Sequence, residues 1–105
     1  MRGSTPLEGG GERSEMEAAK EVMRRRDGVE REIQDILQSL EAEQVGENGS
    51  LVDKEGFPRS DIDVHSIRLE RNRLAMLKQD HKHLTDEIEA KIAAIHAEAR
   101  ARKAT

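Results

Sequence analysis

The architecture follows from residues 60–95, which read SDIDVHSIRLERNRLAMLKQDHKHLTDEIEAKIAAI. Apolar residues recur along this stretch three, four or seven positions apart, which is the spacing of a coiled-coil seam. They are Ile67, Leu74, Leu77, Leu84, Ile88, Ile92 and Ile95. No glycine or proline interrupts residues 59–105. The pattern therefore predicts one long helix over about residues 61–101, with a single apolar stripe.

Residues 58–63 carry the signals of a helix start. Ser60 is a good N-cap residue, and Asp63 follows at the capping-box spacing. Asp61 and Asp63 would also place negative charge in the first turn, where the helix dipole favours it. Pro58 restricts the backbone just before the helix. We therefore expect Ser60 to cap this helix.

A second stripe precedes it, with spacings of seven, four, three and four residues. Its members are Val22, Val29, Ile33, Ile36 and Leu40. Glutamate, alanine, arginine and glutamine fill most of the other positions, and they are good helix formers. The pattern predicts a helix over about residues 15–44, with Ser14 as a candidate cap and Gly46 as the stop signal.

Between the two stripes, residues 46–59 read GENGSLVDKEGFPR and hold three glycines and a proline. This composition predicts a loop over about residues 45–60. The loop is long for a connection between two helices, and it carries the apolar residues Leu51, Val52 and Phe57. Phe57 is expected to pack onto the helices and pin the loop. The alternative is an exposed anchor for a partner.

The composition favours elongated helices over a compact core. Hydrophobic residues make up 34% of the chain and charged residues 38%, and Phe57 is its one aromatic residue. Two striped helices joined by a loop predict an all-α fold, an antiparallel, coiled-coil-like two-helix hairpin with a long ordered connecting loop. This hairpin domain would cover residues 14–105. Residues 1–13, MRGSTPLEGGGER, are expected to be a flexible tail, and its first four residues resemble an expression-tag leader.

The charge balance and the absent residue types exclude several classes. The net charge is −4, so no strong positive field marks the chain for nucleic acid. There is no cysteine for disulfides or thiolate metal sites. No apolar run has the length of a membrane span, and residues 1–12 lack the apolar stretch of a secretory signal. We expect a cytoplasmic and nuclear protein.

Catalytic and metal sites are also not expected. His81 and His83 are two residues apart on a helix, so they point in different directions and do not share a metal simply. His81 falls on the seam, where a polar residue sets register. The sequence has no cysteine nucleophile and no glycine-rich phosphate loop before a helix. The prediction is a non-enzymatic binding module without metal, cofactor or small-molecule ligand.

The run from Ser50 to Leu84 resembles the N-terminal domain of the proteasome non-ATPase regulatory subunit nine family. The matching pattern is an apolar pair before Asp, a Gly-aromatic-Pro-Arg segment, an Asp-apolar-Asp step, and a polar run on the helix. In this chain these are Leu51-Val52-Asp53, Gly56-Phe57-Pro58-Arg59, Asp61-Ile62-Asp63 and Gln79-Asp80-His81-Lys82. The resemblance covers roughly residues 20–100, more loosely in the first helix.

The resemblance implies a chaperone for assembly of the proteasome regulatory particle. Its members bind the C-terminal domain of one ATPase subunit and leave before the mature particle forms. They normally continue into a PDZ-like domain, which this chain is expected to lack. The residues expected to contact the partner lie in the loop and on the second helix: Phe57, Pro58, Arg59, Asp61, Asp63, Arg68 and Arg71.

Two other functions stay open on the sequence. A generic coiled-coil interaction or dimerisation module would use the stripes alone. An RNA-binding hairpin would set its arginine runs, residues 24–26 and 68–73, against phosphates, although acidic neighbours such as Glu21 and Glu70 favour a solvated face or a protein-binding patch.

Overall fold

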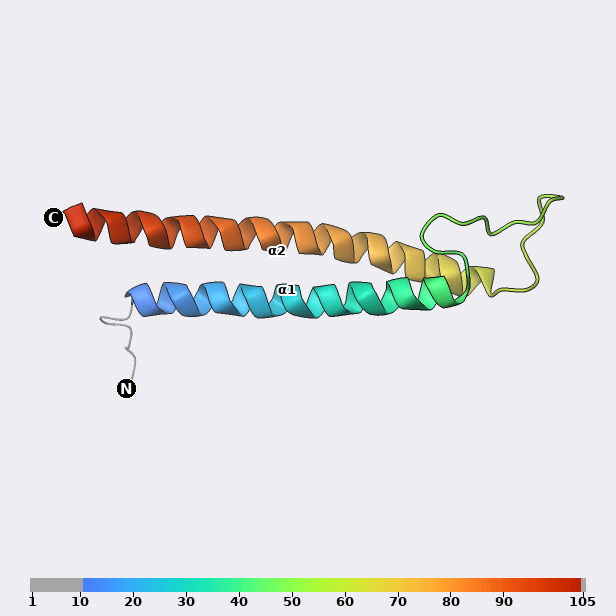
Figure 1. Cartoon of the computed structure of the whole chain (residues 1–105), viewed down its shortest axis with the longest axis horizontal. Helices are drawn as coiled ribbons and strands as arrows, with labels where there is room; N and C mark the ends of the chain where they lie inside the picture. Colours follow the sequence, from blue (N-terminus) through green and yellow to red (C-terminus); the bar gives the residue numbers. More distant parts are fainter. Residues whose placement is uncertain (1–10, 105) are drawn as a thin grey trace, which may run out of the picture. The chain divides into compact units, whose positions relative to one another are not determined.

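The computed structural model describes the backbone of residues 11–104 and the side chains of residues 14–104. Two helices make up most of this part, α1 (Gly11–Ala42) and α2 (Val64–Ala104), and no strand occurs within it (Figure 1). The described chain is all-helical, as predicted. Residues 1–10, which the sequence assigns to a flexible tail, lie outside the described residues.

The helix ends differ from the predicted boundaries by two to four residues. α1 begins at Gly11, so residues 11–13 belong to the helix and not to the predicted tail. α2 begins at Val64, because Asp63 and not Ser60 occupies the N-cap. The Asp63 carboxylate accepts a hydrogen bond from the Ser66 amide at 3.1 Å, and the Asp63 carbonyl accepts one from the Ile67 amide at 3.0 Å.

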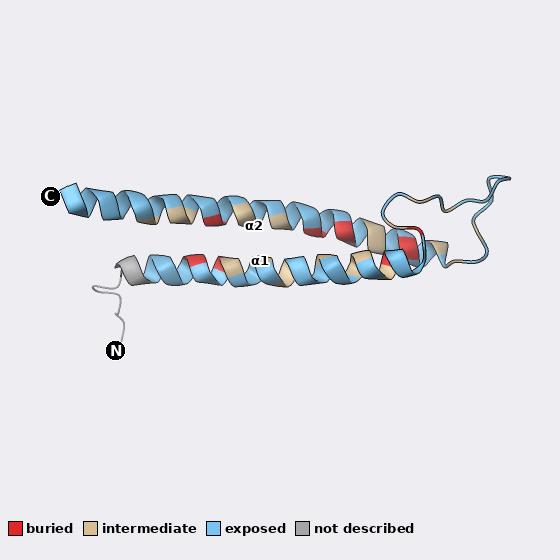
Figure 2. Cartoon of the chain, viewed as in Figure 1, coloured by how far each residue is buried: buried red, intermediate tan, exposed pale blue. Residues whose placement is uncertain are grey.

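The chain divides into two compact units, and each contains a segment of both helices. Unit 1 comprises residues 11–27 and 82–104 of the described part, and unit 2 comprises Gly28–His81. Each unit has its own buried residues, and those of unit 2 lie around the end of α1 and the start of α2 (Figure 2).

The core of unit 2 is built from four buried side chains of both helices and the segment between them. They are Leu40, Val45, Ile67 and Leu74, and Leu40 is completely buried. Partly buried apolar side chains pack around them: Ile33, Ile36, Leu37, Leu51 and Ile62. Burial of these side chains is the main favourable term for folding this unit, at about 1.5–3 kcal/mol for each one fully removed from water.

Polar pairs across unit 2 show the relative direction of its two helical segments. Glu30 pairs with His81 at 2.8 Å, Glu32 with Arg73 at 2.9 Å, and Ser39 with Glu70 at 2.9 Å. Because the numbers rise along α1 while they fall along α2, the two segments run antiparallel. His81 thus makes a cross-helix contact from the seam position that the sequence assigned to it.

Unit 1 has a smaller buried set, formed by Ala19, Val22 and Ile88. Arg26 donates a hydrogen bond to the Thr85 hydroxyl at 3.3 Å, which links the α1 and α2 segments of this unit. All residues of the two predicted stripes, in both units, are buried or half-buried. The periodicity therefore identified the inward faces correctly.

α1 ends in a Schellman motif. The Val45 amide donates to the Leu40 carbonyl at 3.3 Å, and the Gln44 amide donates to the Glu41 carbonyl at 2.8 Å. Gln44 adopts the left-handed conformation that the motif requires, with φ of 62°. Leu40 and Val45 make the apolar contact that accompanies it. The predicted stop at Gly46 is therefore two residues late, although Gly46 also has positive φ.

Arg71 of α2 binds the chain just after this motif. Its guanidinium donates to the carbonyls of Gly46 at 3.1 Å, Val45 at 3.3 Å and Gly49 at 2.8 Å. These carbonyls lie where the backbone has left the helix and has few partners of its own. One side chain thus ties the end of α1 to the first half of α2.

Within residues 11–104, neither helix is both long and apolar enough to cross a membrane.

Replacing Arg71 by alanine is expected to lower the free energy of unfolding by about 2–3 kcal/mol, because three half-buried carbonyls lose a charged donor. Arg73→Ala is the matched control. It removes an exposed ion pair with Glu32 and should cost less than about 1 kcal/mol. Urea unfolding followed by circular dichroism measures both, and equal losses would contradict the role assigned to Arg71.

Two substitutions near the Schellman motif are expected to have opposite signs. Gln44→Gly should raise the free energy of unfolding by about 0.5–1 kcal/mol, because glycine adopts positive φ without steric cost. Gly49→Ala should lower it by more than about 1 kcal/mol, because the new Cβ would overlap the Val45 carbonyl oxygen. The same unfolding experiment tests the pair. Destabilisation by Gln44→Gly would refute the motif.

Candidate functional site

The segment between the helices contains a short antiparallel turn that presents the central motif. Val52 and Pro58 face each other as an isolated bridge. The Asp53 amide donates to the Phe57 carbonyl at 2.7 Å, and the Arg59 amide donates to the Leu51 carbonyl at 3.0 Å. Two hydrogen bonds that flank the bridge thus fix the register of the turn, and this places Phe57 and Pro58 on one arm.

The Asp53 carboxylate organises the tip of this turn. It accepts hydrogen bonds from the amides of Glu55 at 3.0 Å and Phe57 at 2.9 Å, while the Asp53 carbonyl accepts one from Gly56 at 3.0 Å. Gly56 has φ of 90°, a conformation that side chains rarely adopt. The sequence analysis named Asp53 only as part of the family pattern and missed its role in the turn, although an Asp three residues before Gly is a recognisable turn signal.

Arg59 and Asp61 join the base of the turn to the approach to α2. The Arg59 guanidinium donates to both Asp61 carboxylate oxygens, at 3.1 and 2.8 Å, and also to the Ser50 carbonyl at 3.0 Å. These side-chain hydrogen bonds lower the pKa of the Asp61 carboxyl from its ordinary value of 3.8 and raise the pKa of Arg59. The pair therefore holds both arms of the turn together.

Phe57 does not pack onto the helices. Its side chain is 66% exposed, the largest exposure among the large hydrophobic residues of the described chain, and Val52 across the bridge is 43% exposed. The preferred interpretation of Phe57 as a pin for the loop was therefore wrong. Asp53, Gly56 and Arg59 hold the turn through backbone and polar contacts, so the aromatic ring is left facing solvent.

The other candidate residues divide into structural and free side chains. Asp63 caps α2. Arg71 binds the carbonyls after α1, so its guanidinium is engaged within the chain and is not free for the partner contact that the sequence analysis expected. Arg68 is exposed and makes no hydrogen bond or ion pair with side chains of the described residues. Of these three, Arg68 alone has a side chain available to a partner.

Two exposed apolar residues of α2 were missed on the sequence. Leu69 is 57% exposed and Met76 is 52% exposed. They are seven residues apart, but they lie two positions off the seam residues Ile67 and Leu74. The seven-residue spacing of Leu69 and Met76 is a second apolar repeat on the same helix, and it could have identified them.

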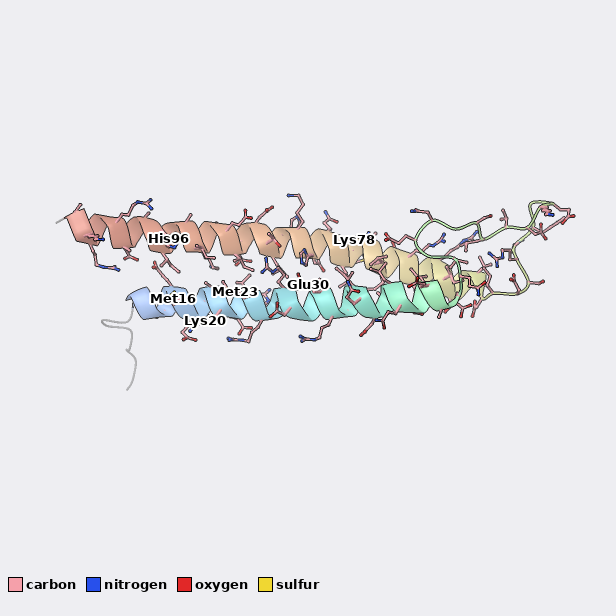
Figure 3. All side chains as sticks on the ribbon, in the orientation of Figure 1. Met16, Lys20, Met23, Glu30, Lys78 and His96 are labelled. Atoms are coloured by element: carbon pink, nitrogen blue, oxygen red, sulfur yellow. The ribbon has the colours of Figure 1, made fainter. Side chains whose placement is uncertain are left out.

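The described residues offer contact surfaces that are open to solvent. Among the described residues, no three histidine or acidic side chains come together as metal ligands. A hollow of about 400 Å³ in unit 2 is lined by Glu30, Ile33, Gln34, Lys78 and His81. It is open to solvent, and Figure 3 marks Glu30 on α1 and Lys78 on α2 at its sides. Such a site suits recognition by shape and charge.

An acid titration is expected to reveal the Arg59–Asp61 pair. Because the pKa of Asp61 is lowered, the pair stabilises the turn above pH 3.8 and is lost as the pH falls through the lowered pKa. Arg59→Gln should raise the pKa of Asp61 toward 3.8, measured by carboxyl-carbon NMR. Lys54→Gln, which removes another cation of this turn, is the control and should leave the Asp61 titration unchanged. No shift with Arg59→Gln would contradict the pairing.

Comparison with known proteins places this sequence. The family model described as the Nas2 N-terminal domain matches residues 19–97. The human 26S proteasome non-ATPase regulatory subunit 9 is 37% identical over 81 residues, which cover 74% of this chain and 35% of the human protein. The Drosophila melanogaster protein of the same name is 48% identical over 54 residues, which cover 51% of this chain and 24% of that protein.

A fungal relative extends the likeness. The probable 26S proteasome regulatory subunit p27 of Schizosaccharomyces pombe is 45% identical over 62 residues, which cover 55% of this chain and 29% of that protein. No solved structure matches the chain. The chain spans about a third of the length of the mammalian relatives that it matches. Since the family model covers most of its length, this chain belongs to the Nas2 N-terminal domain family.

Proposed function

We propose that this domain is a proteasome-assembly chaperone module, which binds the C-terminal domain of a regulatory-particle ATPase subunit. Membership of the Nas2 N-terminal domain family and relatives named as 26S proteasome regulatory subunits support the proteasomal setting. Binding is non-enzymatic and uses complementary side chains. We also propose that the domain acts in the cytoplasm and nucleus, where proteasomes would be assembled. The proposed binding needs no cofactor.

The observation that carries the proposal is the exposed ring of Phe57 on a hydrogen-bonded turn. Leaving an aromatic side chain 66% exposed forgoes its burial, which is worth about 1.5–3 kcal/mol. A turn fixed by Asp53 and Arg59 holds the backbone of Phe57 in place before a partner arrives. Such pre-organisation lowers the entropy cost of association, and aromatic anchors are frequent hot spots of protein interfaces.

In this proposal the connecting segment is an ordered part of an antiparallel helical hairpin, and it serves as the presenting element. Phe57 and Pro58 supply the apolar contact. Arg59 and Asp61 shape the turn and leave charged edges for the partner, and Arg68 adds a free cation on α2. Asp63 and Arg71 act indirectly, because their side chains hold the backbone that positions the turn.

Calorimetric titration of this chain with each isolated ATPase C-terminal domain tests the proposal. Binding to one domain is expected, and Phe57→Ala should weaken that binding by about tenfold or more because an exposed anchor is removed. Arg59→Glu should also weaken it, because the turn loses its fixed geometry.

Met16→Ala is the matched control, since Met16 is an exposed apolar residue of α1 in unit 1. It should leave the affinity unchanged. Circular dichroism should report the same helix content for wild type, Phe57→Ala and Met16→Ala. Failure of the wild-type chain to bind every ATPase C-terminal domain would contradict the proposed function. Unchanged affinity of a folded Phe57→Ala variant would remove the turn from the interface.

A further inference from the structure

The outward face of α2 in unit 2 carries a second row of residues, which we call the outer stripe. Its members are His65, Leu69, Asn72, Met76 and Gln79. Their spacings of four, three, four and three are those of a coiled-coil seam. All five are exposed. At 100° per residue, the row lies roughly opposite the buried Ile67 and Leu74, so it takes no part in the contact between α1 and α2.

The outer stripe has an unusual composition for a face in contact with water. It contains no Asp, Glu, Lys or Arg, in a chain where these make up 38% of the residues. Solvent faces of helices are normally charged or strongly polar. The outward face of α1 in the same unit follows that rule, with Arg31 and Asp35 among its exposed residues. The heptad spacing and the exposed Leu69 and Met76 together make the outer stripe a seam without a partner.

Arg68 adds a charge beside this seam. It lies next to Leu69 in the sequence and one helical turn before Asn72. The neighbouring arginines are occupied: Arg59 by Asp61, Arg71 by three carbonyls and Arg73 by Glu32. Arg68 has no such partner among the described residues. A cation held at the edge of an apolar seam favours a carboxylate on whatever covers that seam.

We propose that the outer stripe and Arg68 receive one acidic amphipathic helix of the partner. That helix would present apolar residues three to four positions apart against Leu69 and Met76, and a carboxylate to Arg68. Asn72 sets the register of the contact as a polar residue at a seam position. This inference rests on the proposed function, and it names the kind of surface that the ATPase C-terminal domain uses.

A second copy of this chain is the competing occupant, and the size of the stripe disfavours it. Stable interfaces bury more than about 1,000 Å², and the outer stripe offers only two apolar side chains from each copy. A partner that also contacts the Phe57 turn has no such shortage, because the turn and the stripe both belong to unit 2. Neither surface needs to supply the whole affinity.

The test uses the 105-residue chain and the ATPase C-terminal domain that binds it. Leu69→Glu with Met76→Glu should weaken binding by about tenfold or more, and Arg68→Glu by about fivefold or more. Two controls add the same charges to the outward face of α1: Gln38→Glu with Ala42→Glu, and Arg31→Glu. These controls should change the affinity by less than about twofold. Thermal melts should show that all variants remain helical, since every substituted residue is exposed.

The outcomes separate the stripe from the proposed function. Backbone NMR shifts at residues 65–79 on binding, together with the selective losses, would support the proposal. If neither Leu69→Glu with Met76→Glu nor Arg68→Glu changes the affinity, the proposal about the outer stripe is overturned while the proposed function stands. Absence of wild-type binding to any ATPase domain would overturn both. A wild-type dimer in sedimentation equilibrium that becomes monomeric with Leu69→Glu and Met76→Glu would also overturn it, because a second copy would then occupy the stripe.

Discussion

The hydrogen bonds from Arg71 to the carbonyls of Val45, Gly46 and Gly49 are the contact on which the segment between the helices depends. A helix that ends must satisfy its last carbonyls and those of the chain that leaves it. The Schellman motif at Gln44 satisfies some of the helix carbonyls, and Arg71 satisfies those that follow. Because Arg71 comes from α2, the same bonds hold the start of the connecting segment against that helix. The turn that carries Phe57 is built on this anchored segment.

The sequence predicted the inward faces of the helices, which depend on periodicity. It did not predict the exact helix ends, which depend on single hydrogen bonds. The inward positions of both stripes were found because burial repeats along a helix. The ends of the helices were not, since Ser60 and Asp63 are both acceptable caps and only the geometry chooses Asp63. Gln44 at positive φ breaks the usual preference for glycine, so Gly46 was the natural but wrong choice of stop.

The candidate site shows the same division. Phe57, Arg59 and Asp61 were singled out from the motif, and the structure places all three in or beside one turn. The exposure of Phe57 was foreseen only as the alternative interpretation, because an isolated aromatic residue usually indicates packing. Arginine is usually a surface residue, yet the Arg71 guanidinium donates to backbone carbonyls. The sequence gives no sign of these contacts. Leu69 and Met76 were missed because the helix that contains them already had one apolar stripe.

Binding of a proteasomal ATPase C-terminal domain through the Phe57 turn is the central claim, and site-specific photo-crosslinking tests it most directly. A photoreactive phenylalanine analogue at position 57 replaces an exposed ring by one of similar shape. It should cross-link to one ATPase subunit within that subunit's C-terminal domain, whereas the same analogue at the exposed position 16 should not. Cross-links from position 16 to the ATPase, with none from position 57, would contradict the account.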